Sequence, residues 1–361
     1  MPDPRAAPVG IMEVAALSGF SPATVSRALR GLPGVSVKTR EAVEQAAQTL
    51  GYTPSPWATA LTTGRTNAVA VIAPWVSRWF FSAVIEGAQD VLTQHGYDLM
   101  LYPFGVDGGV DAHSLSKRVD GVLALNVPLA HRSIGALGGL GVPIVTLGSA
   151  IEGVSSVLVD NVVVGQRATQ HLIDLGHRRI AFFGDQDGEA QGFPVAVDRH
   201  RGYDMALRAA GVEPDPGLVY SSGFTINGGE AALHRALAEF PGEDRPTAVF
   251  AVSDEVAIGA LHAARMHGLR IPENLSVIGV DGHDFAYLFD LSTISQPVRD
   301  QGRIAARLLL EQVNDPDHTP TAVNVGCELI RRGSTGPVRS FRSDPVRIHS
   351  SAGPKPTTRS S

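Results

Sequence analysis

The residues with the clearest chemical potential lie in a short segment near the N-terminus. Thr24, Ser26 and Arg27 fall on one face of a predicted helix, opposite the apolar Val25 and Ala28. Short hydroxyl side chains suit contacts with phosphate, and an arginine can bind a guanine edge through two parallel hydrogen bonds. The pattern indicates nucleic-acid binding. A solvated helix face without a partner is the alternative.

The spacing around this face is typical of a helix-turn-helix. Such a motif needs a small residue where its two helices cross, here Ala15, and a residue that tolerates left-handed geometry in the turn, here Gly19. An apolar residue follows six positions later, here Val25. A generic helical hairpin could share these three residues. Apolar periodicity predicts three short helices within residues 11–51.

Length and composition bound the remaining possibilities. The chain has 361 residues, enough for two or three domains, and its apolar content of 43% excludes global disorder. Apolar runs reach about eight residues, whereas a bilayer span needs about 18, so we expect no membrane segment. The first ten residues lack a secretion signal and the single Cys327 cannot form an internal disulfide. These features favour a cytoplasmic protein.

The charge is distributed unevenly. Residues 1–65 carry six Lys/Arg and four acidic residues, whereas the whole chain has a net charge of −6. A basic head on an acidic body suits a nucleic-acid-binding module joined to a sensor.

Beyond residue 66 the sequence alternates strand-like and helical segments. Continuous β-branched runs predict parallel strands covered on both faces. About ten strands fit two doubly wound subdomains better than one sheet. The expected strands are residues 68–73, 99–102, 121–125, 143–147, 156–159, 180–183, 219–220, 248–252, 276–280 and 293–294. Residues 337–361 lack periodicity and are expected to be a disordered tail.

Polar residues stand where several of these strands end. Asn126 follows residues 121–125, Ser253 follows residues 248–252, and Asp281 ends residues 276–280. Ligands of doubly wound sheets bind beyond the carboxyl ends of the strands. Phosphate-loop, metalloprotease, nucleophile-elbow and dinucleotide motifs are absent. We therefore expect no catalytic residue, metal or cofactor.

Three motifs give the head a specific resemblance. They are S-x-x-T-V-S-R-x-L at 21–29, V-S-x-x-T-R at 35–40 and A-A-x-x-L-G-Y at 46–52. They resemble the DNA-binding head of the lactose/galactose-repressor family of bacterial transcription regulators, and the similarity extends to Thr335. The resemblance implies an all-α helix-turn-helix head and a periplasmic-binding-protein-like α/β core of two doubly wound parallel-sheet subdomains.

The same resemblance implies roles for the residues of the head. Pro22, Ala23 and Arg27 occupy base-reading positions, while Thr24 and Ser26 face phosphates. Proline and alanine side chains donate no hydrogen bonds, so Arg27 would be the main polar reader.

The linker resembles the family's hinge helix, which lies in the DNA minor groove. Ala58 matches its pattern P-[NS]-x-x-A-R-x-L, and Leu61 stands at the leucine that wedges into a base step. Thr59 replaces the usual arginine. The implied operator is double-stranded DNA of near-palindromic sequence.

For the core, the resemblance implies an effector pocket, and a carbohydrate is the expected effector. Arg199 belongs to R-x-x-G-Y, similar to the family's R-x-x-G-[FYW]. Each residue has a plainer alternative, such as a core aromatic, a helix cap or a surface cation. The implied contact residues are Phe80, Phe81, Asn126, Arg199, Phe224, Ser253 and Asp281. An Arg199→Ala variant is expected to keep the fold and to lose effector affinity.

The chain departs from the family in three places within the core. The stretch 105–116 is about ten residues shorter than is typical of the family, so one outer helix of the first subdomain is expected to be missing. Ser253 stands where an asparagine is common, and W-V-S-R-W at 75–79 replaces D-x-S-N-P.

These features predict a homodimeric repressor controlled by a small effector. The expected domains are a head at 1–52, a hinge at 53–66 and a core at 67–336. Its subdomains are expected at 67–160 with 294–325, and at 161–293 with 326–336. One alternative is a solute-binding protein, which would lack residues 1–65 and carry a signal peptide. The other is an α/β enzyme, which would turn over a candidate sugar. Effector identity, induction or corepression, target genes and tetramer formation remain open.

Overall fold

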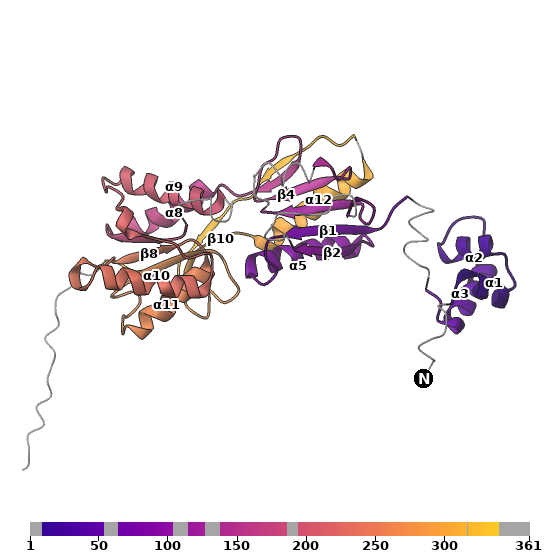
Figure 1. Ribbon diagram of the computed structural model, residues 1–361, viewed down its shortest axis with the longest axis horizontal. Coiled ribbons are helices and arrows are strands. Elements are labelled where there is room, and N and C mark those ends of the chain that lie inside the picture. The colour runs from indigo at the N-terminus through magenta and orange to yellow at the C-terminus, as the bar shows by residue number, and fades with distance from the viewer. Residues whose placement is uncertain are drawn as a thin grey trace, which may run out of the picture. The chain divides into compact units, whose positions relative to one another are not determined.

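A computed structural model describes residues 9–53, 64–103, 115–126, 138–185, 194–315 and 317–338. Two compact units divide the chain: unit 1 comprises Met1–Val157 and Gly302–Ala322, and unit 2 comprises Leu158–Gln301 and Val323–Ser361. The ribbon in Figure 1 shows the elements of each unit. No helix in the described part is both long and apolar enough to cross a bilayer.

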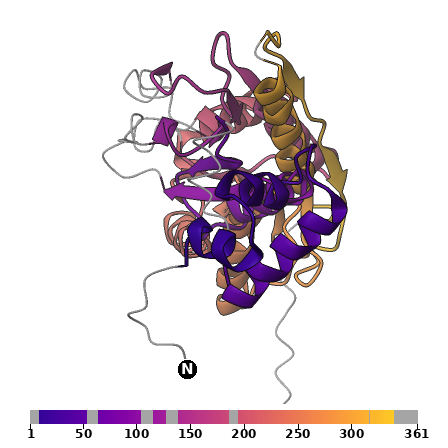
Figure 2. The same ribbon diagram turned by 90° about the vertical axis from the view of Figure 1, so that its right-hand side faces the viewer.

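The head, residues 9–53, is a group of three helices (Figure 1 and Figure 2). They are α1 (Ile11–Ser18), α2 (Pro22–Leu29) and α3 (Val37–Leu50). The hydroxyls of Ser21 and Ser36 cap α2 and α3 by accepting a backbone N–H three residues later. All three helices share one apolar core, which includes Val14, Val25 and Val43. The fold therefore follows the expected helical spacing.

Unit 1 contains a six-stranded sheet in the order β11-β5-β4-β3-β1-β2. Every residue of β1 is buried, as its continuous apolar sequence requires. Helix α5 packs on β1 and β2, and Gly302 of α12 meets the backbone of Val84 in α5. The elements are β1 (Ala68–Ala73), α5 (Trp79–Gln94), β2 (Asp98–Pro103), β3 (Gly121–Leu125), β4 (Ile144–Leu147), β5 (Ser155–Leu158), α12 (Val298–Asn314) and β11 (Ala322–Asn324).

Unit 2 contains a second six-stranded sheet, in the order β12-β10-β9-β8-β6-β7. Figure 1 shows α8 and α9 on one face of this sheet and α10 and α11 on the other. Its strands are β6 (Ile180–Phe183), β7 (Val219–Tyr220), β8 (Ala248–Ala251), β9 (Ser276–Asp281), β10 (Ser292–Ser295) and β12 (Glu328–Ile330). Its helices are α8 (Asn161–Asp174), α9 (Pro194–Ala209), η2 (Pro216–Leu218), α10 (Ile226–Glu239), η3 (Gly242–Asp244) and α11 (Asp254–Met266). Both units thus have the expected doubly wound α/β architecture.

The division between the units differs from the expected subdomain boundaries. Residues 294–301 were expected with the first subdomain, but they belong to unit 2. The reason is that β10 pairs with β9 in parallel, so the chain adds β10 to the second sheet before it crosses at Gln301.

Pro337 and Val338, which were expected to belong to the tail, lie among the described residues. The backbone N–H of Val338 donates to the carbonyl of Leu175 at 2.9 Å, which ties this residue to unit 2. Residues 339–361 lie outside the described residues.

Candidate functional site

The described part of the predicted DNA-reading face is a surface of α2. Gly19 ends α1 with a left-handed φ of 76°, the geometry expected for the turn. Val25, a residue of α2, is fully buried in the core of the head. Pro22, Ala23 and Arg27 are exposed at the surface. The turn at Gly19 and the burial of Val25 together orient the predicted base-reading residues toward solvent.

The Thr24 hydroxyl and the Arg27 guanidinium on this face already have intramolecular partners. The hydroxyls of Thr24 and Ser21 lie 2.9 Å apart, and Ser26 is half-buried. Arg27 donates from Nη2 to the carbonyl oxygen of Pro33 at 2.8 Å. A base contact by Arg27 would require the exchange of this exposed bond for one to DNA. Ala58 and Leu61 lie outside the described residues.

In unit 2, two closely packed helices position Arg199. A Cβ added at Gly165 of α8 would lie 2.1 Å from the carbonyl oxygen of Arg199, and one at Gly202 would lie 2.1 Å from that of Val162. The glycines therefore let α8 and α9 approach through their backbones. This packing fixes the backbone of Arg199, so its side chain reaches the ends of β8 and β9.

Arg199 is buried, with 4% of its surface exposed. Its Nε donates to Oδ1 of Asn161 at 2.9 Å, and its Nη1 donates to the carbonyl oxygen of Val252 at 2.5 Å. The same Nη1 lies 3.6 Å from Oδ1 of Asp281. This environment predicts, contrary to the sequence-based expectation, that Arg199→Ala destabilises the fold.

Two buried carboxyl groups accompany this one guanidinium. Burial raises the pKa of Asp281 to about 7, against the opposing effect of Arg199. Asp281 also accepts a hydrogen bond from Nε2 of Gln296 at 2.8 Å. Burial, followed by the charge of Asp281, raises the pKa of Asp254 well above its usual range. The cluster therefore provides both a fixed cation and a carboxyl group that can change protonation near neutral pH.

The other predicted residues of unit 2 lie at the ends of its elements. Ser253 is buried, and its hydroxyl accepts the backbone N–H of Val256 at 3.3 Å, so it caps α11. Phe224 is half-buried and has a left-handed φ of 55°. Its ring packs against the apolar core of unit 2.

In unit 1, Asn126 follows β3 with a left-handed φ of 45°. Its Oδ1 is buried without a hydrogen-bond partner and would lie 1.8 Å from a Cβ at Gly148. Phe81 is 5% exposed and is one of the buried apolar residues of the protein. Phe80 is half-buried, with its ring centroid 5.4 Å from that of Phe81.

The unexpected W-V-S-R-W segment forms a stacked group at the start of α5. The Arg78 guanidinium lies 3.7 Å from the Trp75 ring centroid, and Trp75 lies 5.9 Å from Phe81. Cation–π contact and ring packing thus hold this segment against unit 1.

Sequence reasoning missed two residues that orient the cluster. Asn161, the first residue of α8, accepts from Arg199, and Gln296, just after β10, donates to Asp281. Both follow strands, so the same rule that selected Asn126 could have found them. The described residues contain no group of three metal-ligating side chains.

A helix-turn-helix head joined to two doubly wound α/β units defines a DNA-binding transcriptional regulator. Residues 10–55 match the model for bacterial regulatory proteins of the lacI family, and residues 169–335 match that for a periplasmic binding protein-like domain. The chain belongs to the lacI family.

Similar proteins extend over most of the chain. The transcriptional regulator CelR of Thermobifida fusca is 36% identical over 89% of this chain and 96% of its own length. The repressor CytR of Escherichia coli K12 is 34% identical over 90% and 95%. These relatives are transcriptional regulators.

Two solved structures share the complete architecture. A CelR–cellobiose complex superimposes with a TM-score of 0.67 at 33% identity, covering 90% of this chain and 99% of that one. The lac repressor dimer bound to operator and the anti-inducer ONPF gives 0.80 at 25% identity, covering 91% and 100%.

Proposed function

We propose that this regulator is a cytoplasmic homodimeric repressor whose effector is a carbohydrate. The observation that carries the effector class is the buried Arg199–Asp281 pair with its amide partners, Asn161 and Gln296. A guanidinium donates to hydroxyl oxygens and a carboxylate accepts from hydroxyl protons, so the pair can bind vicinal hydroxyls. The cellobiose complex of CelR adds support from a relative.

The remaining effector contacts are assigned by position. Asn126 and Phe224 follow strands, and Phe80 lies in the first turn of α5; at such positions rings can cover the apolar face of a sugar and an amide can bind its hydroxyls. Ser253 contributes by capping the helix that begins with Asp254.

For the DNA contact, the exposed start of α2 enters the major groove. Arg27 reads a base edge, Pro22 and Ala23 make apolar contacts, and Thr24 and Ser26 contact phosphates. Residues 53–66 form the hinge, in which Ala58 and Leu61 reach the minor groove.

The proposed dimer contact includes an exposed apolar surface after β9. Phe285, Tyr287 and Leu288 are 55%, 68% and 61% exposed, and Met266 at the end of α11 is 69% exposed. Neighbouring exposed apolar side chains of this size are typical of protein–protein interfaces. The dimeric structure of the lac repressor supports a second copy of this chain as the partner that covers this surface.

The test is a thermal-shift screen of the full chain with cellobiose, ribose and cytidine, followed by calorimetry. A specific ligand raises the unfolding temperature by mass action. We expect a sugar to bind, to change operator affinity in fluorescence anisotropy, and to bind at least tenfold more weakly to Asp281→Asn. Binding of cytidine alone, or equal binding by the variant, would contradict the proposal.

Operator selection from random DNA tests the other half of the function. We expect a near-palindromic site because two-fold protein symmetry imposes two-fold symmetry on the DNA. An asymmetric footprint, or a monomeric protein in sedimentation, would contradict the homodimer.

A further inference from the structure

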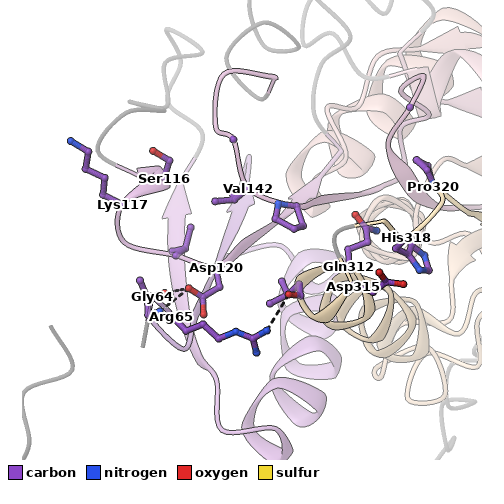
Figure 3. A pocket seen from close by; sticks show the side chains of 16 residues that line it. Gly64, Arg65, Ser116, Lys117, Asp120, Val142, Gln312, Asp315, His318 and Pro320 are labelled. Atoms are coloured by element: carbon purple, nitrogen blue, oxygen red, sulfur yellow. Dashed lines mark hydrogen bonds between the residues drawn. The ribbon is translucent and has the colours of Figure 1, made fainter. Parts of the chain in front are cut away.

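Unit 1 contains a depression of about 820 Å³ beside the point where the chain enters β1. Figure 3 shows Arg65 passing from this entry toward the end of α12, while Lys117 points away. Gln312, Asp315 and His318 come from the end of α12 and the segment after it. The depression lies within unit 1, so it is separate from the Arg199–Asp281 cluster of unit 2.

Two polar groups in its wall have unmet hydrogen-bonding capacity. Nε2 of Gln312 and Nε2 of His318 are buried without a hydrogen-bond partner. Buried polar groups are nearly always hydrogen-bonded, and an exception points to a water, an ion or a ligand. Because both side chains line the same depression, one bound molecule could satisfy both nitrogens.

The positive and negative charges of the wall nearly balance, and Asp120 and Arg65 already form hydrogen bonds within unit 1. Asp120 accepts from the backbone N–H and hydroxyl of Thr66 at 2.7 and 2.8 Å, and from the N–H of Asn67 at 2.9 Å. Arg65 donates to Oδ1 of Asn314 at 2.9 Å and to the carbonyl of Val313 at 3.3 Å, at the negative end of α12. These bonds leave no excess of one charge to select an ion.

The wall also includes apolar side chains, among them Val119, Val142 and Pro143. Single waters could satisfy the two nitrogens but would leave this surface wet. A molecule with several hydroxyls and a flat C–H face matches both the polar and the apolar groups of this wall, because ligand sites combine apolar walls with a few directed polar groups. The volume suits one or two sugar rings.

We propose that this depression is a second ligand site, which takes a neutral, hydroxyl-rich molecule through Gln312 and His318. Oxygen atoms of such a molecule accept hydrogen bonds from the side-chain amide of Gln312. Its ring packs on the valine and proline wall. The carbohydrate effector proposed above would bind at the Arg199–Asp281 cluster of unit 2, independently of this second site.

The test is NMR of the full chain with ¹³C-labelled histidine, in which His318→Gln identifies the His318 signal. The probes are glucose, ribose and xylitol, with sodium acetate and sodium phosphate as charged probes. We expect a saturable shift of the His318 signal with at least one neutral probe. The shift should persist in Asp281→Asn, which separates this site from the proposed effector site.

Two matched variants establish the role of Gln312. Gln312→Leu and the conservative Gln312→Glu both remove the donor and should weaken binding at least fivefold. Gln170→Leu, at an exposed position on α8, should leave binding unchanged. No saturable shift with any neutral probe, saturation by the charged probes alone, or unchanged affinity in both Gln312 variants would overturn the proposal.

Discussion

Replacement of Arg199 by methionine tests whether the buried cluster is a paired charge site. The guanidinium is 4% exposed and contacts Asp281, Asn161 and the carbonyl of Val252. Removal of one partner from a buried pair costs about 3–5 kcal/mol. For a unit of this size, we expect the unfolding temperature to fall by roughly 6–20 °C, at about 2–4 °C per kcal/mol.

The pH dependence of this loss provides a sharper test. The pKa of Asp281 is raised to about 7, so folding favours its protonated form and its ionisation destabilises the protein as pH rises from 4 toward 7. Without Arg199 the pKa should rise further. The variant then keeps losing stability above pH 7, where the parent does not. The difference between the two proteins should grow by about 1.4 kcal/mol per pH unit in that range.

Differential scanning calorimetry at pH 6 and pH 8 measures both effects. Arg201→Met is the matched control, because Arg201 is exposed on the same helix, and it should change the unfolding temperature little. A loss below about 2 °C, well under the range expected for a broken buried pair, or a larger loss at pH 6 than at pH 8, would refute the assignment of a buried, coupled pair.

The other predictions concern separate parts of the molecule. Burial lowers the pKa of His177, so its contribution to stability is present above about pH 6.5 and is lost as pH falls below it. His177→Gln should therefore flatten the pH dependence of the stability measured by calorimetry between pH 5 and 7, and an unchanged slope would contradict this. If ionised Asp281 accepts effector hydroxyls, effector affinity should rise between pH 6 and 8, and calorimetry with Asp281→Asn should show no such rise. Ser21→Ala should cost the head about 1 kcal/mol in thermal unfolding, and a neutral result would show that the cap is dispensable. Leu61→Ala should weaken operator binding by a few kcal/mol in anisotropy titrations, and equal binding would place Leu61 outside the DNA.

Local patterns in the sequence predicted the head and most of the strands because they reflect local physics. Gly19 and Ser21 mark a turn and a cap within a few residues, and the buried run of β1 has no alternative to a covered parallel strand. The strands β11 and β12 were missed. Each has three residues that are exposed or half-buried, so neither carries an apolar run.

The candidate site could be predicted only in part. The rule about strand ends located Asp281, but it could not show that Arg199 is buried, since arginine is usually exposed. Burial of Arg199 depends on the close approach of α8 and α9 through Gly165, a contact between segments 34 positions apart in the sequence. Its partner Asn161 looks like an ordinary start of a helix.

The anchorage of Thr66 by Asp120 sets a length scale for the whole regulator. Three hydrogen bonds fix the chain where it enters β1, and the head ends at Thr53. About a dozen residues separate these points, and a chain extends by at most about 3.5 Å per residue, so the tether cannot exceed roughly 45 Å. In the proposed homodimer, binding of one head therefore confines the second to a small volume near its half-site. This confinement raises the effective concentration of the second head, which any lengthening of residues 54–65 would dilute.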